Sequence, residues 1–134
     1  MADFDLSKMQ AIEAYKLLVS IVAPRPIGWI STISDSGVSN LAPFSFFNML
    51  GNNPPIMGFS ASINRDGKFK DTFVNAQQTK CFVHNVVTRD LCEKMNSTSE
   101  NFPYGVSEFE KVGLTPVASS KVKALRVKES PINL

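Results

Sequence analysis

Three short segments of the sequence carry polar residue types that could hold an anionic or planar ligand. Hydroxyls at the end of a strand can bind phosphate oxygens, and a lysine at a helix N-terminus adds charge to free backbone amides. A planar heteroaromatic ring needs a flat apolar wall with a few polar groups at its edge. The segments that supply such groups are Ser31-Thr32, Asn40–Asn48 and Lys70-Asp71-Thr72.

Each segment alone also has an ordinary structural interpretation. Ser31-Thr32 fits a strand that runs to a turn, and Asn40–Asn48 fits a core strand that runs into a loop. Asp71 can cap a helix while Lys70 stays solvated. Only the combination of the three segments, together with an arginine held extended between two prolines at Pro24-Arg25-Pro26, carries weight.

Hydrolytic and metal-dependent catalysis find little support in the sequence. His84 lies in an apolar segment, which favours a satisfied core or interface residue over a catalyst. The serines have no evident His and Asp partners, and the acidic residues are scattered. Cys81 and Cys92 cannot complete a usual zinc set with one histidine. If the protein is an enzyme, a bound cofactor is therefore expected to do the chemistry.

Composition narrows the class of protein further. A chain of 134 residues, 43% of them hydrophobic, suits one globular domain over 1–134. A net charge of +2 without a basic stripe argues against nucleic-acid binding. No apolar run reaches the length of a membrane span, and the acidic start does not fit a signal peptide. Two free thiols and no secretory signal favour a cytoplasmic protein.

The first half of the chain predicts one helix followed by strands. Residues 7–18 have helical periodicity, and 27–33 alternates as a strand. A turn at 34–37 and a return over 38–45 complete a hairpin. Residues 46–53 are expected to form a loop or short helical turn, followed by a strand over 56–62 and a turn over 64–67.

The second half predicts short helices between further strands. Asp71 or Thr72 is expected to cap a helix ending near Gln78, and Thr88 a helix over 89–96. Residues 80–87 form a buried strand in this interpretation. Ser107 to Glu110 has the spacing of a capping box before a short helix ending at Gly113. Residues 114–117 and 122–127 are candidate extended segments.

These elements favour a mainly β fold with short helices, in which antiparallel hairpins close into a small barrel. The tail from Glu129 to Leu134 looks like the approach to another strand. A barrel that stopped there would leave an edge strand unpaired, so part of the fold is expected to be missing.

The order of motifs along the chain resembles the flavin reductase-like family of FMN-binding split β-barrels. Any one motif is weak, but their order from about Ala14 onward is specific. The motifs are Arg25–Thr32 (RPIGWIST), Gly37, Asn40–Asn48 (NLAPFSFFN), Asn53-Pro54-Pro55, Lys70-Asp71-Thr72, Phe82, Asn85, Met95-Asn96, Gly105–Glu110, Gly113–Pro116 and Glu129-Ser130-Pro131.

This resemblance implies a homodimer with FMN near the subunit interface, a small-molecule substrate, and NADH or NADPH as electron donor. Lys70 and Thr72, with Arg25 or Thr32, are expected at the phosphate, and Ser45 to Asn48 near the ring. The flavin-lining residues that it implies are Arg25, Trp29, Ser31, Thr32, Ser45, Phe46, Asn48, Lys70, Asp71 and Thr72. No acid–base catalyst is required, since the nicotinamide passes its hydride directly to the flavin.

Two departures from the family pattern leave alternatives open. His84 stands where similar sequences carry an apolar residue, and similar chains continue for roughly half this length again. The preferred hypothesis is an NAD(P)H-dependent flavin reductase-like oxidoreductase. The alternatives are an FMN-binding protein or electron carrier without turnover, and an inactive truncated product.

Overall fold

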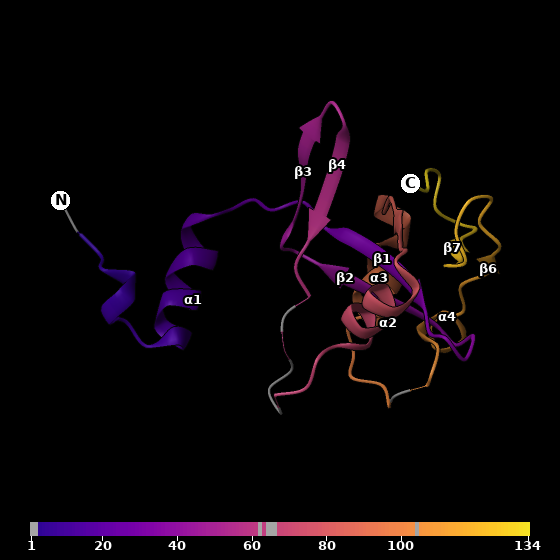
Figure 1. Cartoon of the computed structure of the whole chain (residues 1–134), viewed down its shortest axis with the longest axis horizontal. Helices are drawn as coiled ribbons and strands as arrows, with labels where there is room; N and C mark the ends of the chain where they lie inside the picture. Colours follow the sequence, from indigo (N-terminus) through magenta and orange to yellow (C-terminus); the bar gives the residue numbers. More distant parts are fainter. Residues whose placement is uncertain (1–2, 62, 64–66, 104) are drawn as a thin grey trace.

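The computed structural model describes residues 3–61, 63, 67–103 and 105–134. Its centre is an antiparallel sheet in the order β2-β1-β5 (Figure 1). Strand β1 is Gly28–Ile33, β2 is Ser39–Phe44 and β5 is Val83–Asn85. The mainly β class and the first hairpin are as the sequence predicts, whereas the strand expected over 80–87 is only three residues long.

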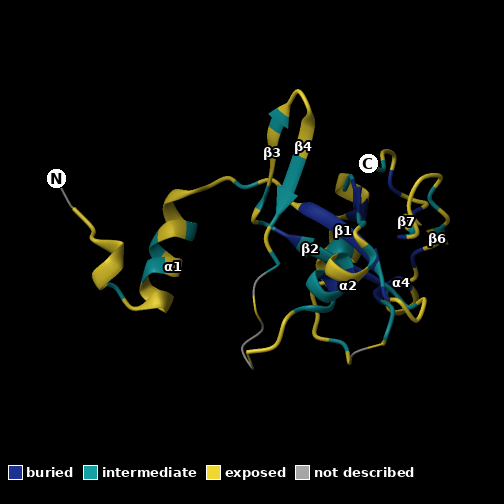
Figure 2. Ribbon diagram, in the orientation of Figure 1, coloured by how far each residue is buried: buried dark blue, intermediate teal, exposed yellow. Residues whose placement is uncertain are grey.

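Strand β1 is covered on both faces, which explains why its residues 28–32 are all buried (Figure 2). On one face, Trp29 joins a core cluster with Leu41, Leu91, Phe109, Leu114 and Val127. On the other face, Thr32 accepts a hydrogen bond from Asn75 of helix α2, Asp71–Thr79. The residues that alternate in the sequence therefore point to two different faces of the strand, and both faces are covered.

The tail of the chain adds to the central sheet beyond β5. The amide of His84 donates to the carbonyl of Leu134 at 2.9 Å, and the amide of Leu134 donates back to His84 at 2.9 Å. Val86 also donates to the carbonyl of Ile132 at 3.0 Å. The tail was expected to lead into a further strand, and its residues Ile132 to Leu134 themselves pair with β5 and Val86.

The segment 46–53 is a strand, so the expected loop or helical turn there is wrong. Strand β3, Phe47–Asn52, pairs antiparallel with β4, Pro55–Phe59, and the turn between them contains a cis Asn53–Pro54 bond. Asn and Gly residues, which are poor strand formers, hid strand β3 in the sequence. Ladder bonds to β4 and the packing of Phe47 on Gly28, where a Cβ would lie 2.5 Å from the Phe47 ring, offset that weak propensity.

The first helices differ from prediction at their starts. Residues 6–8 form a short 3₁₀ turn whose cap is Asp5, and α1 runs over Ala11–Ile21 rather than 7–18. Helix α2 has Lys70 at its N-cap position without a side-chain cap, so the expected capping by Asp71 or Thr72 is wrong. The Thr72 hydroxyl accepts a hydrogen bond from Asn40 instead, because the helix packs on the sheet at that point.

The later helices are shorter than expected. A 3₁₀ turn at Arg89–Leu91 leads into α3, Cys92–Ser97, with Thr88 at the N-cap position but without a side-chain bond. Helix α4 is Glu108–Lys111. The expected capping box before it is wrong, because the Ser107 side chain makes no cap and its hydroxyl lies 3.3 Å from that of Ser39 instead.

The C-terminal region forms a small two-stranded ladder beside the sheet. Strand β6, Pro116–Val117, pairs antiparallel with β7, Arg126–Val127. The third predicted strand is β4, which ends at Phe59, while Ser62 and the turn residues Asn64 to Asp66 lie outside the described residues. Among the described helices, none has the length and apolar character needed to cross a bilayer.

One buried amide joins four parts of this structure. The Asn85 amide donates to the carbonyl of Trp29 at 3.1 Å and to the Ser31 hydroxyl at 3.2 Å. Its carbonyl oxygen accepts from the Val127 amide at 2.8 Å and from the Asn133 side chain at 2.9 Å. The side chain is fully buried, so each of these bonds replaces one to water.

We predict that Asn85→Ala lowers the free energy of unfolding by about 2–4 kcal/mol, because it leaves several buried polar groups without partners. Urea denaturation followed by circular dichroism measures this change. Asn96→Ala, at an exposed position of α3, is the matched control and should stay within about 0.5 kcal/mol. Equal losses for the two variants would contradict the role given to Asn85.

Candidate functional site

A seam of polar side chains joins helix α2 to strands β1 and β2. The Asn40 amide donates to the Thr72 hydroxyl at 2.8 Å, and the Asn75 amide donates to the Thr32 hydroxyl at 3.2 Å. All four side chains are buried. Because these bonds pull the N-terminal turn of α2 onto the sheet, they fix the position of the Lys70-Asp71-Thr72 segment.

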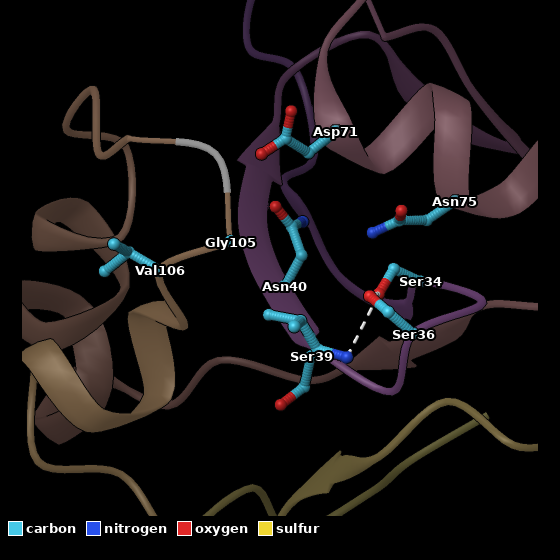
Figure 3. Close-up of a pocket in the computed structure, with 9 residues that line it drawn as sticks. Ser34, Ser36, Ser39, Asn40, Asp71, Asn75, Gly105 and Val106 are labelled. Atoms are coloured by element: carbon cyan, nitrogen blue, oxygen red, sulfur yellow. Dashed lines mark hydrogen bonds between the residues drawn. The ribbon is translucent and has the colours of Figure 1, made fainter.

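Two hollows open along this seam and share Asn40 and Asp71. In the smaller one, Asp71 and Asn75 of α2 lie on one side and Gly105 and Val106 on the other, with Asn40 between them (Figure 3). Its volume of about 20 Å³ is close to that of a single water molecule. It is therefore too small for any aromatic ring.

The larger hollow has a volume of about 120 Å³ and is lined in part by the Lys70-Asp71-Thr72 segment. A small-molecule site for a drug-sized ligand usually encloses 300–1,000 Å³, so this hollow can take only part of a flavin. Its lining residues are Asn40, Ala42, Pro43, Lys70, Asp71, Thr72, Thr98, Ser99, Glu100, Asn101, Phe102 and Glu108.

The charges around the larger hollow are mixed. The Lys70 ammonium lies 5.6 Å from the centroid of the Phe44 ring, beside the first turn of α2. Burial raises the pKa of Asp71. The pKa of Glu108 is raised mainly by burial and also by the charge of Asp71, although its bond from the Leu41 amide, 2.8 Å long, acts in the opposite direction.

The second group of candidate residues lies apart from this hollow, around the start of β3. Arg25 donates to the carbonyls of Val19 and Val22 at 2.8 and 2.6 Å, so it closes the C-terminal end of α1. Its guanidinium lies 5.9 Å from the Phe46 ring centroid, and Tyr15 meets the same ring edge-on at 6.2 Å. Arg25 and Phe46 are thus brought together, away from Lys70.

Two further candidates flank Phe46. Ser45 is half-buried at the end of β2. Asn48 is exposed in β3, and its side-chain oxygen accepts from the amide of Met49 at 2.9 Å. These polar groups and the exposed Phe46 ring lie outside both hollows of the seam and form an open surface.

The remaining candidates, Trp29, Ser31 and Thr32, are fully buried in β1. The Trp29 indole donates to the Thr98 hydroxyl at 3.0 Å. The Ser31 hydroxyl donates to the carbonyl of Leu125 and accepts from Asn85. The structure therefore divides the candidates into three groups. Lys70, Asp71 and Thr72 line one hollow, and Trp29, Ser31 and Thr32 lie inside the fold. A separate surface carries the others, Arg25, Ser45, Phe46 and Asn48.

Sequence reasoning missed two residues that shape the seam. Asn75 lies four positions after Asp71 and three after Thr72, so it shares their face of the helix, and that spacing could have identified it. Glu108 was named only within the capping-box segment and the Gly105–Glu110 motif, without a role of its own. No local pattern predicts that its carboxylate accepts from Leu41, because the two residues are 67 positions apart.

His84 is buried, as expected for a core position, but its hydrogen bonding is incomplete. Its ring lies 4.6 Å from that of Phe47, and Nδ1 has no hydrogen-bond partner among the described residues. The expectation that His84 is satisfied is therefore wrong for this atom. Burial lowers the pKa of His84, because the charged ring would lose its hydration.

A third, mainly apolar hollow of about 390 Å³ lies beside His84. Its walls come from the start of β1, the end of β5 and helix α3. The residues are Ile27, His84, Val86, Val87, Thr88, Arg89, Cys92 and Met95. None of these residues belongs to the candidate set taken from the sequence.

Comparisons with known proteins place the mainly antiparallel fold in the split-barrel class. The chain is 47% identical over 98% of its length to a protein from Aquifex aeolicus. The crystal structure of nitrilotriacetate monooxygenase component B from Bacillus cereus matches all of the chain at 32% identity, with a TM-score of 0.92. A protein assigned as a flavin reductase with a split barrel domain, from Shewanella frigidimarina, matches 99% of it at 29% identity and TM-score 0.78.

The family follows directly from the sequence match. The model of the flavin reductase like domain matches residues 22–134, and the chain belongs to this family. The chain spans 67% of the Aquifex protein and 66% of each of the two crystal structures. What the longer proteins do as wholes is therefore a matter for proposal.

We predict that Glu108→Gln makes stability less sensitive to pH above about 4.5. Since burial raises the Glu108 pKa, the native state binds more protons than the unfolded state between the unfolded and folded pKa values, and stability falls as pH rises through that window. Glutamine cannot titrate, yet its side-chain oxygen can still accept from Leu41. The difference in unfolding free energy, variant minus wild type, should grow from pH 4 to pH 7 in urea denaturation; a constant difference would contradict it.

Proposed function

We propose that the chain binds FMN and forms the flavin-holding part of an NAD(P)H-dependent oxidoreductase. Two observations together support this proposal. The chain belongs to the flavin reductase-like family, and the Lys70-Asp71-Thr72 segment, which Asn40 and Asn75 hold against the sheet, lines a polar hollow. In such proteins the flavin itself supplies the redox chemistry, taking a hydride from a nicotinamide and passing electrons on.

The donor and acceptor set of the larger hollow fits the ribityl phosphate end of FMN. Lys70 supplies a positive charge beside the first turn of α2, and the Thr72 hydroxyl is left with a proton to donate because its oxygen accepts from Asn40. Asp71 and Glu108 would repel a phosphate close to them but can accept from ribityl hydroxyls. Lys70 is therefore the residue that we assign to the phosphate.

The ring has to lie outside this hollow, whose volume is too small for it. We assign Ser45, Phe46 and Asn48 to the ring, since they form an open surface with an apolar face and polar edges. Trp29, Ser31 and Thr32 are fully buried and act by positioning β1, while Arg25 holds the end of α1 against Phe46. An open surface needs a cover, which a second copy of the chain supplies in this proposal.

Electron transfer places few demands on side-chain acid–base groups. In this proposal the substrate is a small molecule that accepts electrons from the flavin. The free thiols Cys81 and Cys92 suit a reducing compartment, and we propose the cytoplasm. Addition of NADH or NADPH without oxygen tests the reductase activity, because a functional site should lose its yellow colour within seconds. Bound flavin that stays yellow with both nicotinamides would favour a carrier without turnover.

We predict that Lys70→Met weakens FMN binding about tenfold or more while leaving riboflavin binding unchanged. FMN carries the phosphate and riboflavin does not. The loss of one charge-assisted hydrogen bond weakens binding by about a factor of ten or more. Fluorescence titration of both flavins against the purified chain measures the two dissociation constants. Lys121→Met, at an exposed position outside the hollow, is the control and should change neither.

Two results would overturn this assignment. Equal weakening of FMN and riboflavin by Lys70→Met would mean that the lysine shapes the site without contacting phosphate. An unmodified chain that binds neither flavin would remove the proposed function altogether.

A further inference from the structure

Helix α1 has no core of its own. It stands away from the sheets at the end of the extended segment 22–27 (Figure 1), and none of its residues is buried (Figure 2). Ile12, Tyr15 and Ile21 are 60%, 51% and 67% exposed. Only Glu13 and Lys16 of its eleven residues are charged. A helix of this length is marginal in water, and one that is apolar on several faces is typical of a buried position.

The β3–β4 hairpin also lacks a core of its own. It projects from the central sheet as two strands alone (Figure 1), and a two-stranded hairpin is at best marginally stable in water. Met49, Leu50 and Ile56 are 61%, 68% and 46% exposed. No residue of either strand is buried, so these apolar side chains lack a full cover within their own chain.

The sequence around the hairpin also lacks the charged residues that commonly protect an exposed strand edge. No charged residue occurs between Asp35 and Arg65. Exposed edges usually carry lysine or other charges that prevent pairing with another chain, whereas the centres of protein interfaces are depleted of charge. The hairpin therefore has the composition of a surface that is covered in the working protein.

We propose that α1 of one copy packs across the β3–β4 hairpin of a second copy, and that the second α1 does the same in return. This inference rests on the homodimer of the proposed function and specifies which elements of the two copies meet in it. A twofold arrangement uses the same surface on both copies, so one exchange covers both incomplete elements. Phe46, which Tyr15 and Arg25 contact in one chain, lies at the base of this surface.

The dimensions agree with this exchange. Eleven helical residues are about 16 Å long, and the six residues of β3 span about 20 Å. Together, α1 and the hairpin comprise about two dozen residues, within the 20–30 per side of a standard interface. The extended placement of α1 is shared with the Bacillus cereus crystal structure, since an arm placed elsewhere would not give a TM-score of 0.92 over the whole chain.

Crosslinking between different copies tests the exchange directly. Cys81 and Cys92 are first changed to serine, and Tyr15→Cys and Met49→Cys are made in separate chains of that background. We expect mixing and mild oxidation to give a disulfide-linked dimer that contains both chains. Tyr15→Cys mixed with Lys121→Cys, whose residue lies in the C-terminal loop outside both surfaces, is the matched control and should give no crosslink above background.

A second measurement keeps the proposal testable if the cysteine variants fold poorly. Light scattering should show a dimer for the unmodified chain, and Ile12→Glu should raise its dissociation constant at least about 100-fold. Val122→Glu, at a partly exposed position outside both surfaces, should leave the constant unchanged. Circular dichroism checks that both variants keep their secondary structure.

A monomeric unmodified chain, or a dimer in which Tyr15→Cys and Met49→Cys never crosslink between copies, would overturn the proposal. The first result would indicate that another segment covers α1, and the second that the copies meet elsewhere. Flavin titration of the same samples separates the two failures. A chain that binds FMN without the Tyr15–Met49 crosslink overturns only this proposal, whereas a chain that binds neither FMN nor riboflavin overturns the proposed function.

Discussion

The side-chain amide of Asn85 is the constraint on which the rest of the sheet depends. A buried amide has two donors and an acceptor oxygen that must all find partners, and here these partners come from β1, β7 and the tail. Residues more than forty positions apart are thereby fixed in one register. Helix α2 bonds to Thr32 of β1 and to Asn40 of β2, which pairs with β1, so the position of the hollow depends on this one side chain through the strand it holds.

The site itself is built from neutral hydrogen bonds that restrain charged groups. Asn40 and Asn75 tie α2 to the sheet, which leaves Lys70 and Asp71 at the edge of the structure where a ligand can reach them. Carboxylates outnumber the lysine in the hollow, which argues against a plain anion site and for a ligand with hydroxyls as well as phosphate. The separation of this hollow from the surface around Phe46 suits a ligand with a polar end and a planar end.

The strands that adjoin clear turn signals could be predicted from the sequence. Residues 27–33 alternate and lead into a turn with Gly37 at φ 88°, so the hairpin with 38–45 was predictable. Strand β3 was hidden because Asn48, Gly51 and Asn52 favour loops, and only its pairing with β4 and the contact of Phe47 with Gly28 decide otherwise. In the site, the Lys70-Asp71-Thr72 segment was predictable from its motif. Glu108 was not, since its partner is distant in sequence and its role exists only in the folded chain.

The contact between Glu108 and the Leu41 amide has a consequence for how the sheet can grow. A strand joining the central sheet on the β2 side would need that amide as a donor, but the carboxylate already accepts from it. Such a strand would also have to displace α4, which packs against β2 and carries the buried Phe109. The sheet is therefore terminated on this side by a side chain, and stacking of one molecule's strands onto another's in fibre-like assemblies is blocked there without any charged residue in β2 itself.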